Sequence, residues 1–513
     1  MLINSSILFL AFGASVLAKH HYGTPKDLSR VINITLTPVV THDKISGIAG
    51  EYILHYHTKK NHTLVDIPIS LAGKPTAAYN TETLTAKDKK GKLKLLASEG
   101  EDADGQPTRY FRPIRDTEGP VTVRFTAKPN NKTYPHIGPL FDLRENGLEN
   151  VGGIVGSSWA LLPGVSNLTQ QYDWSYRWDL RHAPKGTNTA WTWGEGAGPF
   201  YLTAPRADVL YTYFSVGKLS QYPPTGTRPV DPKHKFGMYW LDEPVFNATE
   251  LAGFINSFFN YSTTFWQDQS SLPYRVFIRH NARGELGSGG TALNQSFSFG
   301  WNAHNETNQE YLRLLISHEM THNWAIMPGA GALNSRWAEG MAEFYSLRLL
   351  WRAHLLNTTT YAKEMNYRVN RYYINPYVNY TDEAAYDLAW KDAAAQHIPY
   401  GRGLIELANI DAEVRNKSKN AMGLDFLTLK MRKLCVTGSA DCTPATWLKY
   451  TADYLGPSAV TEYNRTTSGK PVIQPLPGSL GPCFDVVQTE SNPQVWQWRA
   501  KKEVDIESEK CII

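Results

Sequence analysis

The spacing of apolar residues changes near residue 245, and this change constrains the fold more than any other feature of the chain. Before it, short apolar runs alternate with turn residues, as in segments 30–40, 49–58 and 120–129, which is typical of β-strands. After it, apolar residues recur at helical spacing, first in segment 248–266. A chain of 513 residues is too long for one core. We therefore expect a multidomain α+β protein.

The pattern also sets the expected domain bounds. We expect a β-rich N-terminal domain over residues 19–205, a mainly helical domain over residues 206–455 and an irregular tail over residues 456–513. Segments 207–217 and 273–280 are predicted strands, and the charged segment 87–92 is a predicted hairpin tip. Further helices are predicted near residues 308–326, 335–354, 381–397, 401–415 and 422–433.

The first eighteen residues have no charged side chain and contain an apolar run from Ile7 to Leu17. This run is shorter than the about 20 residues that span a bilayer, and small residues suit cleavage after Ala18. Residues 1–18 are therefore a predicted secretory signal peptide. Twelve Asn-x-Ser/Thr sequons follow, a number that favours a secreted eukaryotic glycoprotein. We expect no stable membrane anchor.

All four cysteines lie in the last eighty residues. In an oxidising compartment they predict two disulfides, for which three pairings exist. We favour Cys435–Cys442, which closes a small loop, with Cys483–Cys511 tying down the tail. The net charge of +4 is small and dispersed, so nucleic acid is not an expected partner.

Two histidines and a glutamate form the motif His318-Glu319-Met320-Thr321-His322 in a predicted helix. Helix positions i and i+4 lie about 40° apart on one face, so His318 and His322 suit two positions of a tetrahedral Zn²⁺ site. Glu319 points about 100° away from His318 and suits a general base that acts on a water at the metal's open side. The motif also arises by chance, so a third ligand is needed.

The third ligand is offered by the segment RWAEGMAEFY, residues 336–345. Glu339 and Glu343 are spaced i and i+4 on this second predicted helix. Pro328, Gly329 and Gly331 lie between the two helices and allow the chain to reverse, so that the helices pack together. Spacing alone does not choose between the two glutamates.

These motifs resemble those of the gluzincin zinc metallopeptidases, in particular the glycyl aminopeptidase family, relatives of aminopeptidase N and thermolysin. The resemblance rests on the HExxH motif and on W-x-E-G-x-x-x-[FY]-Y, which begins at Trp337. It implies a thermolysin-like catalytic domain with one Zn²⁺ per chain, held by His318, His322 and Glu339. Glu343 would then hold the N–H of a ligand histidine.

A further segment, Pro399-Tyr400-Gly401-Arg402-Gly403, resembles the P-Y-x-K-G segment of the same families, with Arg402 in place of lysine. The resemblance implies that Tyr400 stabilises the oxyanion, while Glu319 activates a zinc-bound water. The expected function is therefore a secreted zinc-dependent peptidase that acts on peptides or proteins. The alternative is a catalytically weak or inactive peptidase-fold protein that binds them.

The chain departs from its relatives in the predicted substrate-binding strand, which contains Gly289, Gly290, Thr291 and Ala292. Relatives that remove one N-terminal residue have G-G-L-E-H or G-x-M-E-N here, and the glutamate binds the substrate ammonium. Ala292 stands at that position. Unless another acid such as Glu285 supplies the charge, strict aminopeptidase specificity is not expected. Exopeptidase and endopeptidase activity both stay open.

Two smaller departures concern a loop and a sequon. Sixteen residues separate His322 from Glu339, where relatives of aminopeptidase N usually have eighteen. Asn294 lies in a sequon next to the predicted substrate strand, where a glycan would obstruct a peptide. We therefore expect either that this sequon is unused or that the strand is assigned incorrectly.

Overall fold

The computed structural model describes most of the chain. The described residues are 28–102, 105–133, 139–147, 151–165, 170–224, 236–270, 272–281, 289–302, 308–325, 327, 331–389, 391–437 and 442–513. The predicted signal peptide, Glu285, Pro328 and Gly329 lie outside them. The chain forms two compact units, which are treated separately below. Unit 1 contains residues 15–252 and 270–308, and unit 2 contains residues 253–269 and 309–513.

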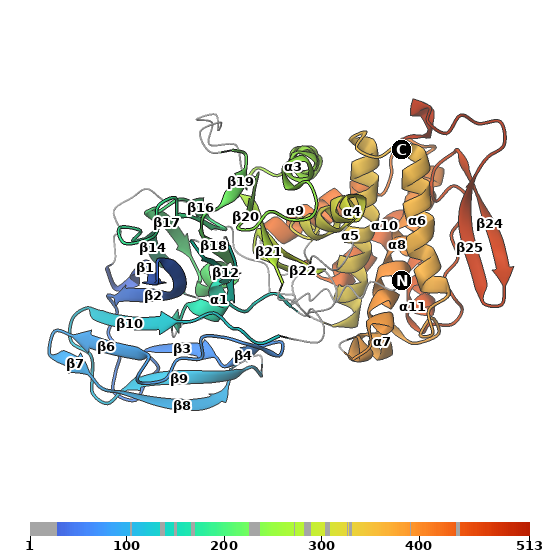
Figure 1. The fold of residues 1–513 in the computed structure, drawn as a ribbon. Coiled ribbons are helices and arrows are strands. Elements are labelled where there is room, and N and C mark those ends of the chain that lie inside the picture. Colours follow the sequence, from blue (N-terminus) through green and yellow to red (C-terminus); the bar gives the residue numbers. More distant parts are fainter. Residues whose placement is uncertain are drawn as a thin grey trace. The chain divides into compact units, whose positions relative to one another are not determined.

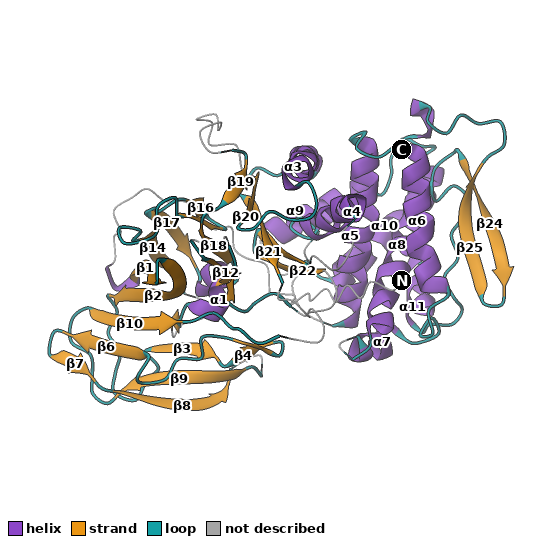
Figure 2. Cartoon of the chain, in the orientation of Figure 1, coloured by secondary structure: helices purple, strands orange, loops and turns teal. Residues whose placement is uncertain are grey.

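Unit 1 is built mainly from sheets, whose strands are drawn as arrows in Figure 2. The first sheet has the order β17-β14-β1-β2-β10-β6-β7. Its strands are β1 (Val31–Thr41), β2 (Lys44–Leu54), β6 (Leu84–Asp88), β7 (Gly91–Leu93), β10 (Val121–Ala127), β14 (Tyr172–Trp178) and β17 (Phe200–Ala204). Ile32, Ile34 and Leu36 of β1 are buried at every second position, as expected of a strand with one face in the core.

Two more sheets and a short hairpin complete the N-terminal part. One sheet contains β13 (Gly164–Val165), β3 (Val65–Pro68), β9 (Pro107–Pro113) and β8 (Leu95–Glu101), in that order. The other contains β11 (Arg144–Glu145), β12 (Gly153–Ser157), β18 (Tyr213–Gly217), β15 (Asn188–Trp191) and β16 (Gly194–Glu195). The hairpin pairs β4 (Ser70–Leu71) with β5 (Lys74–Pro75). The short helices are η1 (Leu28–Arg30), α1 (Ser158–Leu161) and α2 (Arg206–Leu210).

The last sheet of unit 1 has the order β19-β20-β21-β23-β22. Its strands are β19 (Ser220–Tyr222), β20 (Phe236–Trp240), β21 (Tyr274–His280), β22 (Gly289–Leu293) and β23 (Ser296–Trp301). The three central strands are parallel, and β22 pairs antiparallel with β23 at one edge. The predicted substrate-binding segment therefore lies on a strand at the edge of this sheet, as far as the described strands show.

Unit 2 is mainly helical (Figure 1). Its helices are α4 (Gln309–Thr321), α5 (Ala332–Arg352), α6 (Thr358–Tyr373), α7 (Asp382–Leu388), α8 (Ala393–Lys417), α9 (Asp425–Val436), α10 (Pro444–Leu455) and α11 (Ser458–Thr467), together with most of α3 (Ala248–Phe265). Helix α5 packs against α4 and α8, and α6 packs against α8. None of the described helices is long and apolar enough to cross a membrane.

The β-rich and helical parts confirm the expected α+β class, but several details differ from the sequence-based predictions. Segment 207–217 is only partly a strand, because it begins within α2. Helix α6 was not predicted, and α8 begins at Ala393 and continues through Pro399. The predicted domain bounds at residues 205 and 455 stay predictions.

The C-terminal tail is more regular than the sequence suggested. After α11 it forms a hairpin of β24 (Phe484–Ser491) and β25 (Gln494–Ala500), and it ends with η2 (Glu509–Cys511). The preferred cysteine pairing is confirmed, since Cys435 bonds to Cys442 and Cys483 to Cys511. The expectation of an irregular tail was wrong because cross-strand pairing, which brings ladder hydrogen bonds and burial of Val495 and Trp498, outweighs a composition rich in turn residues.

Candidate metal centre

Helix α4, which belongs to unit 2, carries the histidine motif. Leu312, Leu315 and Ile316 are buried on this helix and anchor it. His318 and Glu319 lie in its last turn, and His322 follows directly after its last residue. The exposed fractions of these three side chains are 5% or less, so the motif is shielded from bulk water.

Helix α5 brings one of its two glutamates to the histidines. Glu339 Oε2 lies 3.4 Å from His318 Nε2 and 3.6 Å from His322 Nε2, and the two Nε2 atoms are 3.2 Å apart. The ligand atoms of the three residues all lie within 4.8 Å of one another. Glu343 instead lies on the opposite nitrogen of His318, with its Oε2 3.9 Å from Nδ1. Packing of α5 on α4 therefore selects Glu339, a choice that spacing could not make.

These residues fit a zinc ion. Two imidazole nitrogens that face each other at hydrogen-bond distance need a shared proton or a shared cation between them. Glu339 Oε2 is buried and has no hydrogen-bond partner among the described residues. A buried carboxylate beside two imidazoles is one of the donor sets that Zn²⁺ prefers. Burial raises the pKa of Glu339, but the two imidazoles outweigh burial and hold this pKa at about 2.

Glu319 is fully buried, and neither of its carboxylate oxygens has a hydrogen-bond partner among the described residues. Burial raises its pKa to about 8, although the adjacent His318 opposes this rise. A buried acid without hydrogen bonds costs stability and is uncommon unless function requires it. Its role as a general base stays a prediction.

Tyr400 lies on α8 and stacks on a ligand ring. The Tyr400 and His318 ring centroids are 5.6 Å apart and the rings are nearly parallel. Burial raises the pKa of Tyr400 well above its usual value, and the nearby Glu339 and Glu319 raise it further. The phenol therefore keeps its proton and remains a hydrogen-bond donor at the centre. His397, one turn earlier, lies 5.9 Å from Tyr400 between ring centroids.

Two glycines of the matched motifs allow α5 and α8 to approach closely. A Cβ on Gly340 would lie 2.5 Å from Gly403 Cα, and a Cβ on Gly403 would lie 2.3 Å from the Arg336 carbonyl oxygen. Both contacts are with backbone atoms, so neither helix can accommodate a side chain without moving. This crossing sets the distance between Glu339 and Tyr400, which explains the glycines in E-G and Y-G-R-G.

Arg402, which replaces the expected lysine, is held by several acceptors. Its guanidinium donates to Asp382 Oδ1 and to the carbonyl oxygens of Val378 and Tyr380. A planar guanidinium serves several separate acceptors from fixed positions, whereas an ammonium is a single point charge. Arg402 thus fixes α8 to α7 and to the segment before it.

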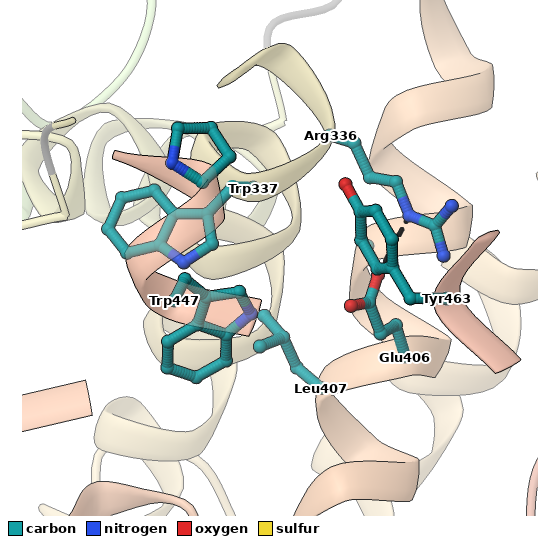
Figure 3. A pocket seen from close by; sticks show the side chains of 8 residues that line it. Arg336, Trp337, Glu406, Leu407, Trp447 and Tyr463 are labelled. Carbon is teal, nitrogen blue, oxygen red and sulfur yellow. Dashed lines mark hydrogen bonds and ion pairs between the residues drawn. The ribbon is translucent and has the colours of Figure 1, made fainter. Parts of the chain in front are cut away.

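Away from the candidate metal ligands, α5 and α8 also line a small pocket (Figure 3). Trp337 and Trp447 lie on one side, and Arg336, Glu406 and Tyr463 on the other, with Arg336 Nε donating to Glu406 Oε2 at 2.7 Å. The volume open to the centre of a water molecule is about 10 Å³. That is room for roughly one water, so this pocket does not receive a peptide. Its ion pair braces the helices that carry Glu339 and Tyr400.

Solved structures of other proteins have the same fold as this chain. No protein-family model and no curated protein sequence matches the chain. Among solved structures, an aminopeptidase N family protein from Idiomarina loihiensis has a TM-score of 0.62 at 13% identity, covering 89% of this chain and 79% of that one. The chain has the fold of the M1 zinc metallopeptidases. The resemblance seen in the motifs is thereby confirmed at the level of fold.

Two further solved structures are similar in fold to this chain. A mutant M1 zinc metallopeptidase from Deinococcus radiodurans, bound to a Tyr-Ser-Ala substrate, has a TM-score of 0.52 at 13% identity and covers 87% of this chain and 96% of that one. Native LTA4 hydrolase from Saccharomyces cerevisiae has a TM-score of 0.51 at 11% identity, covering 87% of this chain and 68% of that one.

The predicted substrate-binding residues are not part of the cluster. Gly289, Gly290, Thr291 and Ala292 all lie on β22 in unit 1, whereas the ligand triad lies in unit 2. Thr291 is buried and its Oγ1 accepts from Leu140 N at 3.0 Å, while Ala292 is half-buried. Their role in substrate binding stays a prediction.

Sequence analysis missed one residue of the centre, Arg368 on α6, which donates from Nε to Glu343 Oε2. The cap at Asn357, whose side chain accepts from Thr360 N, was a signal that a helix begins there.

Proposed function

We propose that this protein is a zinc-dependent peptidase with a thermolysin-like catalytic domain. The observation that carries the proposal is the convergence of His318, His322 and Glu339 beside Glu319, a buried carboxylate without hydrogen bonds among the described residues. An ordinary buried ion-pair cluster would not leave both oxygens of an acid unused.

Each residue has a defined part in the proposed reaction. When bound, Zn²⁺ supplies Lewis acidity toward a carbonyl group and lowers the pKa of a water molecule. His318 Nε2, His322 Nε2 and Glu339 Oε2 would hold the ion. Glu319 would accept a proton at a carboxylate oxygen as the water oxygen bonds to the carbonyl carbon, and would pass that proton to the amine nitrogen as the C–N bond breaks. The Tyr400 hydroxyl donates a hydrogen bond to the oxygen on which negative charge develops.

The substitution Glu319→Gln tests the proposed base. We expect the variant to bind one zinc per chain as the wild type does and to lose peptide hydrolysis by about 10²-fold or more, because an amide cannot accept the proton. Metal content by elemental analysis and cleavage of a mixed peptide library measure the two effects. Asp66→Asn, which changes a buried acid of unit 1 that pairs with Arg206, is the control for loss of a buried acid. Wild-type rates in Glu319→Gln would disprove the assignment.

Whether the enzyme needs a free N-terminus depends on an anchor for the substrate ammonium. Ala292 supplies no charge, so we propose that peptides with blocked N-termini are also cleaved. Matched peptides with free and acetylated N-termini decide this point. Rejection of every acetylated peptide would show an aminopeptidase that uses a different acid. Zinc binding without any cleavage would instead favour the alternative, a peptide-binding protein on a peptidase fold.

We also propose that the protein is secreted and glycosylated. The pairing of all four cysteines supports an oxidising compartment. Asn294 is one sequon that we propose is unused, because its side chain donates to the buried Asp208 carboxylate at 3.3 Å. N-terminal sequencing and glycopeptide mass spectrometry of the protein from a eukaryotic culture medium provide the test. A mature chain that still begins at Met1 would contradict secretion by signal cleavage.

A further inference from the structure

One carboxylate oxygen of Glu343 lies close to both the guanidinium of Arg368 and the imidazole ring of His318. Glu343 Oε2 accepts from Arg368 Nε and lies 3.9 Å from His318 Nδ1. Arg368 also donates from Nη1 to Glu364 Oε2 at 3.2 Å, one helical turn earlier on α6. The exposed side-chain fractions are 7% for Glu343, 11% for Arg368 and 14% for Glu364. A row of charges with alternating sign therefore extends from α6 through α5 to His318 on α4.

The orientation of His318 explains why this row matters to a metal. Its Nε2 faces Glu339 and His322, so Nδ1 is the nitrogen left to carry the proton. Glu343 Oε2, at 3.9 Å, is too far from Nδ1 for a hydrogen bond, but its negative charge on this side of the ring favours the tautomer that carries the proton on Nδ1. A buried glutamate without a counter-charge would not hold this position, because desolvation favours its neutral, reoriented form.

We propose that Arg368 is a positioning residue of the metal centre, which fixes the Glu343 carboxylate beside His318 Nδ1 and so orients His318 for a divalent cation. This inference rests on the proposed function, since it assumes that His318 is a ligand. Glu364 restrains the guanidinium from its other side, so the fork serves two acceptors at once. A lysine would keep the charge but would not reproduce this two-sided geometry.

The competing explanation is that the Arg368–Glu343 pair merely joins α6 to α5. Arg352 provides a matched comparison, because it lies on α5, is 16% exposed and donates to Asp425 Oδ2 at 2.7 Å and to the Ile513 carbonyl oxygen at 2.6 Å. Neither of these partners is one of the ligand residues. Replacing a purely structural arginine of this kind should change the stability of the protein without changing its affinity for the metal.

Zinc affinity measured by competition with a chromophoric chelator, together with the visible spectrum of the Co²⁺-loaded full chain, tests the proposal. We expect Arg368→Met to bind zinc about 10- to 100-fold more weakly and to change the Co²⁺ spectrum. Arg368→Lys should recover part of the affinity. Arg352→Met should bind zinc as the wild type does, even if its melting temperature falls.

Two results would overturn the inference: wild-type zinc affinity and spectrum in Arg368→Met, or equal weakening in Arg352→Met. If Arg368→Met does not fold, Arg368→Lys decides the matter, since unchanged affinity in that variant also overturns the proposal. A wild-type chain that binds neither Zn²⁺ nor Co²⁺ would instead refute the proposed function itself, whatever the variants show.

Discussion

Glu339 and Glu343 lie one turn apart on α5, yet their surroundings assign them different tasks. Glu339 faces the Nε2 atoms of both histidines, whereas Glu343 faces His318 Nδ1 and Arg368. One acid can therefore touch a metal, while the other acts only through a ligand ring. The same residue type at the same helical offset differs in function because of what packs against each side chain.

This difference predicts unequal effects of two identical substitutions. Glu339→Gln should abolish stoichiometric zinc binding, because an amide is a poor replacement for a carboxylate ligand. Glu343→Gln should weaken zinc binding by only about 10- to 100-fold. Equilibrium dialysis against buffered zinc measures both, with circular dichroism as the control for folding. If Glu343→Gln weakened zinc binding more than Glu339→Gln, then Glu343 and not Glu339 would be the metal ligand.

The buried carboxyl group of Asp208 in unit 1 predicts that the stability of the protein depends on pH. Asp208 is 2% exposed, its Oδ2 has no hydrogen-bond partner among the described residues, and burial raises its pKa from 3.8 to about 7. The folded protein therefore binds this proton more tightly than the unfolded chain, and stability should fall as pH rises from about 4 to about 7. The loss amounts to at most about 4 kcal/mol.

Asp208→Asn removes this ionisation, so the variant should melt at a higher temperature than the wild type at pH 8 and at a similar temperature at pH 4. Thermal unfolding at the two pH values measures the effect. Asp142→Asn is a control of opposite sign. Burial raises the pKa of Asp142, but the charges of Arg279 and Arg144 outweigh burial and hold this pKa below its usual value. That variant should be destabilised at pH 8. The prediction would be contradicted if the difference in melting temperature between Asp208→Asn and the wild type were the same at pH 4 and pH 8.

At the scale of elements, the crossing of α5 and α8 determines the geometry of the centre. Gly340 and Gly403 meet there with backbone in contact, while the Arg336–Glu406 pair joins the same helices on another face. Helices in such contact move as one, so the separation of Glu339 from Tyr400 depends on two missing side chains. The motif glycines therefore have a packing function as well as a place in the sequence pattern.

Gly403→Ala should separate the two helices, because its Cβ would lie 2.3 Å from a carbonyl oxygen. We expect a loss of about 1–3 kcal/mol in stability, as for other overpacked sites, and a fall in peptide cleavage as Tyr400 moves. Thermal unfolding and the hydrolysis rate are the measurements. Gly100→Ala is the matched control, since the nearest atom to its Cβ, on the Tyr110 ring, is 3.5 Å away. Equal stability of the two variants would show that α8 accommodates the methyl group.

At the scale of the whole molecule, the C-terminal tail supports the helical unit. Asn366 on α6 donates to the Trp498 carbonyl oxygen and accepts from Trp498 N, both at 2.8 Å, and so holds β25. Glu507 accepts from the backbone N–H groups of Thr358 and Thr359 at the start of α6. The tail is thus bound to the helix that carries Arg368.

Removal of the Cys483–Cys511 disulfide should therefore destabilise the helical unit. Replacing both cysteines by serine frees a loop with a sequence separation of 28 residues, at a cost of about 3–4 kcal/mol in the chain-entropy model. The same change at Cys435–Cys442, with a separation of 7, should cost about 1 kcal/mol less. Melting temperatures of the two double variants measure the difference. A larger loss from the shorter loop would mean that local contacts, and not loop closure, dominate.

The sequence by itself predicted the α+β class and the histidine pair of the zinc motif, and it favoured one of three cysteine pairings. Local periodicity decides the first two features, because the i and i+4 spacing alone places His318 and His322 on one face of a helix. The tertiary structure decided between Glu339 and Glu343, added Arg368 from an unpredicted helix and showed the hairpin in the tail. Each of these depends on contacts between segments distant in sequence, and the free energy of such contacts is set by packing rather than by local pattern.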